Sequence, residues 1–302
     1  MADLVEALRA AGVSDVVTDA PAAPLTTLRV GGPLAALVTV RDGAELEAVG
    51  RVVRDLEAAT IVVGRGSNLL VADAGFRGVA IRLGPAFRDV TIEGTVVTAG
   101  AAAAQPTVAR LVAEAGLAGL GWMAAVPGSI GGAVRMNAGA HGGETRQLLR
   151  AATIVTLGSG ARAWTPDELD FGYRHSAVGE GDVVVHATFA LEAGDPDAIR
   201  REMEEIRNWR REHQPLNEPN CGSVFTNPPG DSAGRLIDAA GCKGYEVGGA
   251  TVSTRHANFI VTRPGATARD VAAVIDHVIA TVAEVAGVTL QTEVVRVGWE
   301  TD

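Results

Sequence analysis

The segment GLGWMAAVPGSIGGAVRMNAGAHGGE, residues 119–144, decides how the rest of the chain is interpreted. It is too long and too rich in glycine for an ordinary loop, because a structureless stretch above about 12 to 15 residues in a compact domain is usually functional or disordered. The apolar residues within it argue against disorder; they are Trp122, Met123, Val126, Ile130 and Val134. Glycine lets the main chain approach a flat ring or phosphates where a Cβ would collide. The segment therefore predicts a site for a large planar cofactor.

A second glycine-rich segment, GRGSNLL (64–70), directly follows the strand-like residues TIVV (60–63). Its backbone N–H groups, with Ser67 and Asn68, could form a nest of donors for a pyrophosphate. The dinucleotide fingerprint fails, because Leu69 stands where GxGxxG needs its third glycine, and the GK[ST] ending of the P-loop is absent. A Rossmann or P-loop fold is disfavoured. A lone turn of this kind is more often a plain connection than a ligand site.

Periodicity predicts alternating strands and helices before residue 214. LAALVTV (34–40) is a strand followed by a helix that Asp42 caps with Glu45 three residues on. Strands follow in VTIEGTVVTAG, ATIVTL and DVVVHATFAL, with a helix between Pro106 and Gly116. A charged helix with Ile199, Met203 and Ile206 on one face then leads to Gln214 and Pro215.

The remainder has the pattern of a compact α+β unit. A helix is expected in DSAGRLIDAAG, and another begins at Thr267 and Asp270. The last strand is expected over LQTEVVRVGW (290–299), with Glu293, Val295 and Val297 on one side.

Composition excludes several classes of protein. The net charge is -10, from 26 Lys plus Arg against 36 Asp plus Glu, and no basic block stands apart, so a nucleic-acid partner is not expected. The N-terminus shows no export signal, and no run of about 18 apolar residues suggests a membrane span. The only cysteines, Cys221 and Cys242, are too few for a zinc cluster or a disulfide framework, so no metal is expected. We expect a cytoplasmic protein without membrane association, and a monomer in preference to an oligomer.

The two glycine-rich segments resemble the FAD-binding loops of the UDP-N-acetylenolpyruvoylglucosamine reductase family. The resemblance rests on VVGRGSNLLVAD and WMAAVPGSIGGAVRMNAGAHGGE, and it continues in order through TTLRVGGP, FGYRHS, PNCGSVFTNP, GYEVGGATVSTRHANFIV and TEVVRVG. It covers the chain from about residue 25 to the end. One such motif would be weak, but the ordered set is highly specific.

The resemblance implies an α+β fold with a two-part FAD-binding region of the vanillyl-alcohol-oxidase type and a C-terminal α+β substrate-binding domain. The parts expected are 1–84 and 85–210 for FAD and 211–302 for substrate. Whether the last strand returns to the FAD region is left open. With 302 residues, the chain resembles the shorter form of the family, which lacks an inserted segment carrying a tyrosine.

The activity implied is a reduction in peptidoglycan synthesis. NADPH reduces non-covalently bound FAD, and UDP-N-acetylglucosamine enolpyruvate is then reduced to UDP-N-acetylmuramate. One alternative is an FAD-linked oxidase on the same cofactor fold, for which His141 is the one histidine placed to raise the question of covalent attachment. Another is a binding protein without turnover.

Three residues match the catalytic positions of the family. Arg174 would stabilise charge on the substrate carboxylate, because a guanidinium can bind both oxygens. Ser223 would donate the proton to C2, with Cys221 as the nearest alternative donor, and Glu293 would orient the other groups. Taken alone, Arg174 and Glu293 read as ordinary surface residues, and Ser223 as part of a turn after Gly222.

The resemblance also implies contacts with cofactor and substrate. The FAD contacts expected are Gly64, Arg65, Gly66, Ser67, Asn68, Leu69, Gly121, Trp122, Ala125, Pro127, Gly128, Ser129, Gly131, Gly132, Asn137 and Gly139. The substrate contacts expected are Tyr173, Asn227, Lys243, Tyr245 and His256. Two positions depart from the family pattern: His213 lies where a lysine or arginine is expected, and His175 has no role that the pattern explains.

Overall fold

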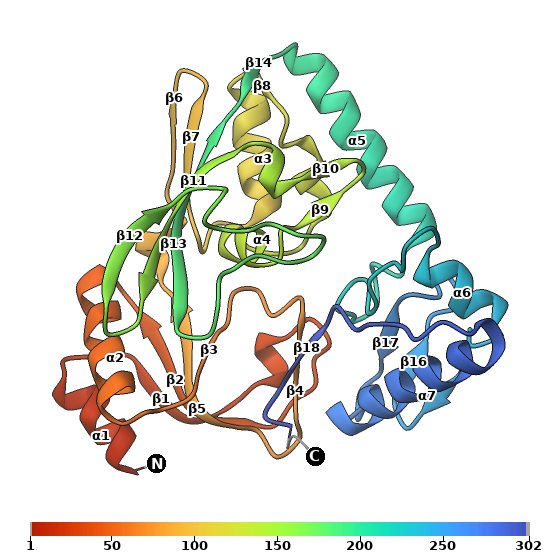
Figure 1. The fold of residues 1–302 in the computed structure, drawn as a ribbon, viewed down its shortest axis with the longest axis horizontal. Helices are drawn as coiled ribbons and strands as arrows, with labels where there is room; N and C mark the ends of the chain where they lie inside the picture. Colours follow the sequence, from red (N-terminus) through yellow and green to blue (C-terminus); the bar gives the residue numbers. More distant parts are fainter. Residues whose placement is uncertain (1, 300–302) are drawn as a thin grey trace. The chain divides into compact units, whose positions relative to one another are not determined.

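The computed structural model describes residues 2–299 of the 302-residue chain. The chain divides into two compact units, and Figure 1 labels the helices and strands of the fold. The first unit comprises the described residues up to Asp19, Ala35–Arg65 and Arg77–Trp209. The second comprises Ala20–Leu34, Gly66–Phe76 and the described residues from Arg210 onward. The boundaries expected after residues 84 and 210 stay predictions.

The N-terminal sheet has the strand order β1-β2-β5-β3, with β3 parallel to β5. Its strands are β1 (Val16–Pro21), β2 (Pro33–Val40), β3 (Thr60–Val62) and β5 (Phe76–Leu83), and its helices are α1 (Ala2–Ala10) and α2 (Gly43–Asp55). Leu46, Val49 and Val53 of α2 are buried, at the spacing that predicted an amphipathic helix. They pack with Leu8 and Val38 in one apolar cluster. The strands predicted over 34–40 and 60–63 are confirmed.

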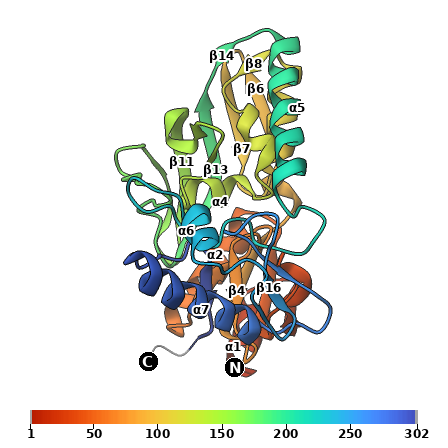
Figure 2. The same cartoon turned by 90° about the vertical axis from the view of Figure 1, so that its right-hand side faces the viewer.

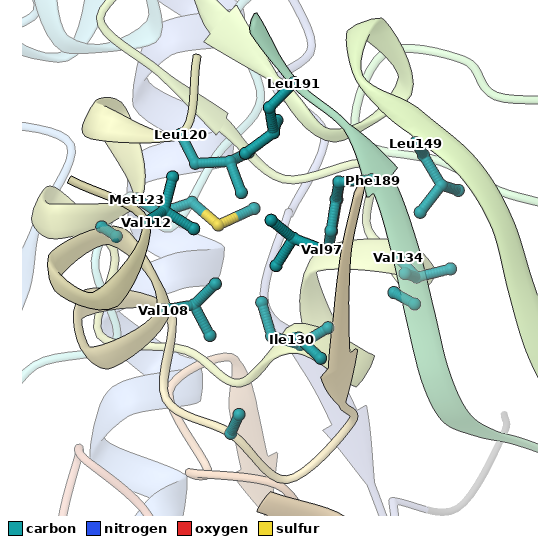
Figure 3. Close-up of a cluster of buried hydrophobic side chains, with 14 of the residues drawn as sticks. Val97, Val108, Val112, Leu120, Met123, Ile130, Val134, Leu149, Phe189 and Leu191 are labelled. Atoms are coloured by element: carbon teal, nitrogen blue, oxygen red, sulfur yellow. The ribbon is translucent and has the colours of Figure 1, made fainter. Parts of the chain in front are cut away.

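The second sheet is antiparallel, in the order β12-β11-β13-β7-β6. Its strands are β6 (Val90–Glu93), β7 (Val96–Gly100), β11 (Leu149–Thr156), β12 (Gly160–Trp164) and β13 (Asp182–Ala190), and the helical turn η2 (Pro85–Arg88) precedes them. Figure 3 shows the cluster on one face of this sheet, where Val108 and Met123 approach Val97 and Phe189. The strands predicted here are confirmed, as is the helix after Pro106, α3 (Gln105–Glu114).

The glycine-rich segment 119–144 folds into short elements. These are η3 (Gly121–Ala125), α4 (Ile130–Arg135), β9 (Gly139–Ala140), β10 (Gly143–Glu144) and, next in the chain, η4 (Thr145–Gln147). A Cβ on Gly143 would lie 2.2 Å from Cδ1 of Trp122, so only glycine fits against that ring. Close packing within the protein therefore accounts for part of the glycine content.

Helix α5 (Pro196–His213) follows the short antiparallel pair β8 (Leu117–Ala118) and β14 (Glu192–Ala193). Its buried side chains are Ile199, Met203 and Ile206, the three that the sequence predicted on one face. Most charged residues on the other faces are exposed, whereas Arg210 is partly buried and donates to Gln214 Oε1 at 2.6 Å.

The second unit contains the small antiparallel sheet β15-β16-β17, against which α7 packs, as the views in Figures 1 and 2 agree. The elements of this unit are η1 (Ala23–Leu25), β15 (Glu246–Val247), β16 (Ala250–Val252), β17 (Ile260–Thr262), α6 (Ala233–Ala239) and α7 (Ala268–Ala286). Thr267 and Asp270 form the predicted capping box of α7. Asp73 adds a second cap, since its carboxylate accepts hydrogen bonds from the N–H groups of Ala268 and Arg269 at 2.8 and 2.9 Å.

The last predicted strand is wrong in its length. Only β18 (Val295–Val297) is a strand, and it pairs in parallel with β4 (Leu69–Val71). Before it, Thr292 forms an isolated antiparallel bridge with Phe225. The chain changes its pairing partner between these two positions, so Glu293 lies outside a regular strand, and no local alternation of apolar residues could reveal this change.

A buried carboxylate holds the N-terminal part of the first unit together. Glu45 is 5% exposed, and it accepts hydrogen bonds from the N–H groups of Ser14 and Arg41 at 2.8 and 2.6 Å and from the Ser14 hydroxyl at 2.8 Å. Asp42 caps α2 through the Glu45 N–H, as expected, but the Glu45 side chain turns to Arg41 and Ser14. Burial alone would raise the pKa of Glu45; these hydrogen bonds and the Arg41 guanidinium outweigh it and lower the pKa to about 2.

We expect Glu45→Gln to lower the free energy of unfolding at pH 7 by about 3 kcal/mol, because a fall in pKa from 4.5 to about 2 stabilises the ionised form by that order. Because the Glu45 pKa is lower in the folded than in the unfolded protein, the ionised carboxylate stabilises the fold at pH values above the unfolded-state pKa. The difference between parent and variant should therefore be constant above pH 5.5 and shrink as the pH falls from about 4.5 to about 2. Urea unfolding followed by circular dichroism measures this.

Glu47→Gln is the matched control, because Glu47 is exposed on the same helix. Equal losses of stability in the two variants, or a difference that does not change with pH, would contradict the assignment to Glu45.

Candidate active site

The loop GRGSN changes direction at Gly66, which has φ +62°. A Cβ there would lie 2.0 Å from the Leu25 carbonyl oxygen, so the position requires glycine on both counts. Among the described residues, the backbone N–H groups of Gly66, Ser67 and Asn68 donate no hydrogen bond. Three consecutive unpaired donors beside a left-handed glycine have the chemistry of an anion-binding nest, which fits the diphosphate of FAD.

The loop PGSIGG at the start of α4, unlike GRGSN, has most of its backbone N–H groups bonded within the protein. Its first three amides are already bonded within the protein: Ile130 N–H to Ala103 O, Gly131 N–H to Ala101 O, and Gly132 N–H to the Ser129 hydroxyl at 3.4 Å. The N-terminus of α4 therefore offers no open row of donors. Gly131 and Gly132 can therefore contact FAD only through close packing, whereas the Ser129 N–H donates no hydrogen bond within residues 2–299 and stays available as a donor.

The two loops approach each other within the first unit. The Arg65 Nε donates to the Pro127 carbonyl oxygen at 2.8 Å, and a Cβ on Gly64 would lie 2.6 Å from Ser129 Oγ. The predicted FAD contacts contain one cation, Arg65, and no carboxylate, a composition that suits a diphosphate. The Nε1 atom of Trp122 is buried without a hydrogen-bond partner among residues 2–299, so this segment has a donor still to be satisfied. These residues fit FAD.

Asn137 uses its side chain within the protein. It is fully buried with φ +40°, and its amide donates to Gly172 O at 2.9 Å and to Glu144 Oε2 at 3.1 Å, while its oxygen accepts from the Arg146 N–H at 3.1 Å. The predicted FAD contact at Asn137 can therefore involve little of its amide. The residue ties the glycine-rich segment to the FGYRHS turn.

Arg174 lies at a strained position of that turn. Gly172 and His175 exchange backbone hydrogen bonds at 3.1 and 3.3 Å, so Tyr173 and Arg174 form a two-residue turn. Arg174 has φ +56°, a conformation that usually selects glycine or asparagine. Its Nη2 donates to the Gly139 carbonyl oxygen at 2.8 Å. Strain of this kind concentrates at functional sites.

Ser223 and Glu293 are neighbours in the second unit. The Glu293 N–H donates to the carbonyl oxygen of Val224, the residue after Ser223, at 2.7 Å. Ser223 is half-buried, and its hydroxyl makes no hydrogen bond within residues 2–299. The turn before it is made by Asn220, whose Oδ1 accepts from the Gly222 N–H at 2.9 Å. Ser223 therefore takes no part in forming that turn, and its hydroxyl is available for another partner.

Asn68 also contacts this pair. Its side-chain amide donates to the Glu293 carbonyl oxygen at 3.0 Å, and its own carbonyl accepts from the Val295 N–H at 3.0 Å. Leu69 follows in β4, opposite Val295. The predicted cofactor loop thus fixes the backbone that follows Glu293.

Cys221 is buried, and burial first and the charge of Glu293 second raise its pKa to about 12. Its thiol stays protonated, but its burial removes it from contact with a substrate. This weakens the alternative of Cys221 as the proton donor.

The predicted substrate contacts have diverse surroundings. Asn227 Oδ1 accepts from the Ala233 N–H at 3.0 Å, Lys243 pairs with Asp238 at 2.7 Å, and Tyr245 stacks on His277 with centroids 3.5 Å apart. Tyr173 is 56% exposed, with the Arg174 guanidinium 5.4 Å from its ring centroid.

His256 is a half-buried member of the predicted substrate contacts. Burial lowers the pKa of His256, and the charges of Lys243 and His213 lower it further. Its Nδ1 accepts from the Asn258 N–H at 3.3 Å, so it is a neutral imidazole near pH 7. His256 can offer a hydrogen bond but not a charge to a phosphate.

The structure brings Ser223, Glu293 and Asn68 together in the second unit and Arg174, Asn137 and Gly139 together in the first. One residue was missed by sequence reasoning: Asn258, which holds the backbone after Ser223. Its motif HANF gave no signal beyond the general resemblance. Within residues 2–299 no group of His, Cys, Asp or Glu could hold a metal ion, and no helix is long and apolar enough to cross a membrane.

Comparison with known proteins assigns the class of protein first. Residues 33–165 match the family described as FAD binding domain, and residues 214–297 match the family described as UDP-N-acetylenolpyruvoylglucosamine reductase, C-terminal domain. The chain is a flavoprotein with the predicted α+β fold class: an FAD-binding domain and a C-terminal domain of the reductase type.

Whole-chain relatives assign the family. The chain is 41% identical over 299 residues to the UDP-N-acetylenolpyruvoylglucosamine reductase of Halalkalibacterium halodurans, covering 99% of each protein. It is 50% identical over 240 residues to that of Heliobacterium modesticaldum, covering 79% of this chain and 76% of the relative. The crystal structure of UDP-N-acetylenolpyruvylglucosamine reductase from Thermus caldophilus has a TM-score of 0.81 and 37% identity, over 94% of this chain and 98% of that one. The chain belongs to the UDP-N-acetylenolpyruvoylglucosamine reductase family.

We expect purified protein to be yellow and to carry about one FAD per chain, released on denaturation. Gly66→Ala should weaken FAD binding by at least ~10-fold, because the new methyl group meets a carbonyl at a left-handed position and the nest must shift. Flavin fluorescence titration of the apoprotein measures the affinity.

Gly94→Ala is the matched control, because Gly94 has φ +61° but nothing within 4 Å of its Cβ position. If both variants bind FAD as the parent does, the GRGSN nest is not the diphosphate site.

Proposed function

We propose that Arg174, Ser223 and Glu293 carry the chemistry of this reductase. As a member of its family, the chain is an FAD-dependent oxidoreductase of peptidoglycan synthesis that uses NADPH to reduce UDP-N-acetylglucosamine enolpyruvate to UDP-N-acetylmuramate. The alternative of an FAD-linked oxidase is disfavoured, because residues 214–297 match the C-terminal domain of the reductase.

When bound, FAD would supply the redox chemistry that links hydride from NADPH to C3 of the enolpyruvyl group. The protein must hold the flavin and manage the charge that appears on the substrate. Arg65 and the amides of Gly66, Ser67 and Asn68 are the groups suited to hold the diphosphate.

Arg174 is suited to stabilise the substrate carboxylate. Hydride addition at C3 places negative charge on C2 and on the adjoining carboxylate, and a guanidinium presents two parallel N–H groups to such an oxygen pair. The left-handed backbone at Arg174 and its hydrogen bond to Gly139 limit the directions that the side chain can take.

Ser223 is suited to protonate C2. A serine hydroxyl is a weak acid, but an enolate-like carbanion is a strong base, and a donor within hydrogen-bond reach can protonate it. The observation that supports this role most directly is the unengaged Ser223 hydroxyl beside the Glu293 segment, whose N–H meets Val224 O at 2.7 Å. Glu293 would orient the donor or the substrate.

The same proposal includes a cytoplasmic location and a monomeric state. Substrate contacts at Tyr173, Asn227, Lys243, Tyr245 and His256 also belong to it. For Lys243 the ion pair with Asp238 means that a substrate phosphate would compete with a carboxylate.

We expect Ser223→Ala to slow flavin reoxidation by the enolpyruvyl substrate by at least ~100-fold, the lower range of positioned acid catalysis. Reduction of the flavin by NADPH should be unchanged, because only the second half-reaction needs a proton on the substrate. Anaerobic stopped-flow spectroscopy at the flavin absorbance measures each half. Equal slowing of both halves would indicate a structural defect, and unchanged reoxidation would remove Ser223 as the donor.

Arg174→Lys should impair flavin reoxidation although the charge is kept, since a single ammonium replaces a two-pronged donor. Arg77→Lys is a control on an exposed arginine in the same unit. Turnover within about twofold of the parent, or ~0.4 kcal/mol, would exclude Arg174 from the assigned role.

A further inference from the structure

The backbone beside Ser223 is held by a single buried asparagine. Asn258 is 4% exposed, and its carbonyl oxygen accepts from the Val224 N–H at 2.9 Å. Its side-chain oxygen accepts from the Phe225 N–H at 2.9 Å, and its amide donates to the Phe225 carbonyl at 2.8 Å. The side chain thus pairs with both polar groups of one peptide backbone, as a neighbouring strand would.

Of the backbone polar groups of Val224 and Phe225, only the Val224 carbonyl oxygen has no bond to Asn258, and it faces Glu293. It accepts from the N–H groups of Glu293 at 2.7 Å and Val294 at 3.4 Å. All backbone donors and acceptors of Val224 and Phe225 therefore have partners, supplied by Asn258 on one side and the Glu293 segment on the other. A two-residue segment held in this way has little freedom to rotate.

The loop that carries Asn258 is itself fixed. It connects β16 to β17, and the Ser253 hydroxyl accepts from the N–H groups of Arg255 and His256 at 3.2 and 3.5 Å. Phe259 N–H closes the turn on the His256 carbonyl at 3.0 Å. Asn258 is therefore held on a rigid element of the second unit and not on a mobile connection.

We propose that Asn258 is a positioning residue for the proton donor: it fixes Val224 and Phe225, and through them the direction of Ser223 and its distance from Glu293. The inference rests on the proposed role of Ser223. Replacing Asn258 leaves a buried N–H and C=O of Phe225 unpaired, and the segment is expected to rotate to recover these bonds. A shift of about 1 Å in a catalytic group is enough to slow a reaction greatly.

Two variants test this in the FAD-loaded enzyme. In Asn258→Leu the side chain keeps a similar volume but loses both hydrogen bonds to Phe225. Asn258→Asp keeps an acceptor for the Phe225 N–H and loses only the donor. It is the variant to measure if Asn258→Leu does not fold. We expect flavin reoxidation at saturating substrate to slow by at least ~10-fold, with little change in apparent substrate affinity. FAD affinity and reduction by NADPH should stay within about twofold of the parent.

Thr262→Val is the matched control. Thr262 is 5% exposed in the same unit, and its hydroxyl donates to the Leu28 carbonyl oxygen at 2.6 Å, with no bond to Val224, Phe225 or Glu293. The Thr262→Val substitution removes a buried hydrogen bond and leaves the contacts of the Ser223 segment unchanged. Folded Thr262→Val should show parental rates in both half-reactions.

A double-mutant cycle decides whether Asn258 acts through Ser223. In the Ser223→Ala background the Asn258 substitution should slow reoxidation by no more than about threefold, since the group that it positions is already gone. An undiminished effect in that background, equal slowing of both half-reactions, or parental rates in a folded Asn258 variant would overturn the inference. Parental reoxidation in Ser223→Ala alone would instead overturn the proposed function, so the two failures are distinguishable.

Discussion

The parallel pairing of β18 with β4 is the contact on which the organisation of the second unit depends. It joins Asn68 to Glu293, 225 positions apart in the chain. The backbones approach so closely beyond it that a Cβ on Gly298 would lie 2.0 Å from Gly75 O, and the Trp299 Nε1 closes the pair on Leu70 O at 3.1 Å. One short ladder therefore fixes both the predicted diphosphate loop and the segment that carries Glu293, so neither can shift without the other within this unit.

Three asparagines hold the main chain near the predicted site residues, each through a side-chain amide that pairs with backbone groups. Asn68 donates to Glu293 O, Asn137 to Gly172 O, and Asn258 exchanges two bonds with Phe225. An amide side chain offers a donor and an acceptor and carries no charge, so it can satisfy buried backbone without the desolvation cost of an ion. It also adds no charge to its surroundings.

Sequence reasoning succeeded where the determinants are local. The capping box of α7 and the buried face of α5 follow from residues three or four positions apart, which are neighbours on the surface of a helix. It failed where the determinants are distant: the strand expected over 290–299 is interrupted because residues near 292 and 295 pair with different segments of the chain. Asn258 was missed for the same reason, since nothing in HANF states that the side chain will meet Phe225. The glycines of residues 119–144 were correctly predicted to allow close approach of the main chain to another group. At Gly143, however, that group is the Trp122 ring of the protein and not a cofactor.

The conformation of Arg174 is evidence of a kind that sequence cannot supply. A non-glycine residue in the left-handed region costs about 1 to 2 kcal/mol, and a glycine would fit the turn at lower conformational cost. The turn nevertheless persists because Asn137 holds Gly172 and because the Ser176 hydroxyl donates to Arg135 O at 2.7 Å. The surrounding bonds thus stabilise a backbone that the arginine itself disfavours. Arg174 therefore does not stabilise this turn through its own backbone, and the strain at its position agrees with the role proposed for it at the substrate carboxylate.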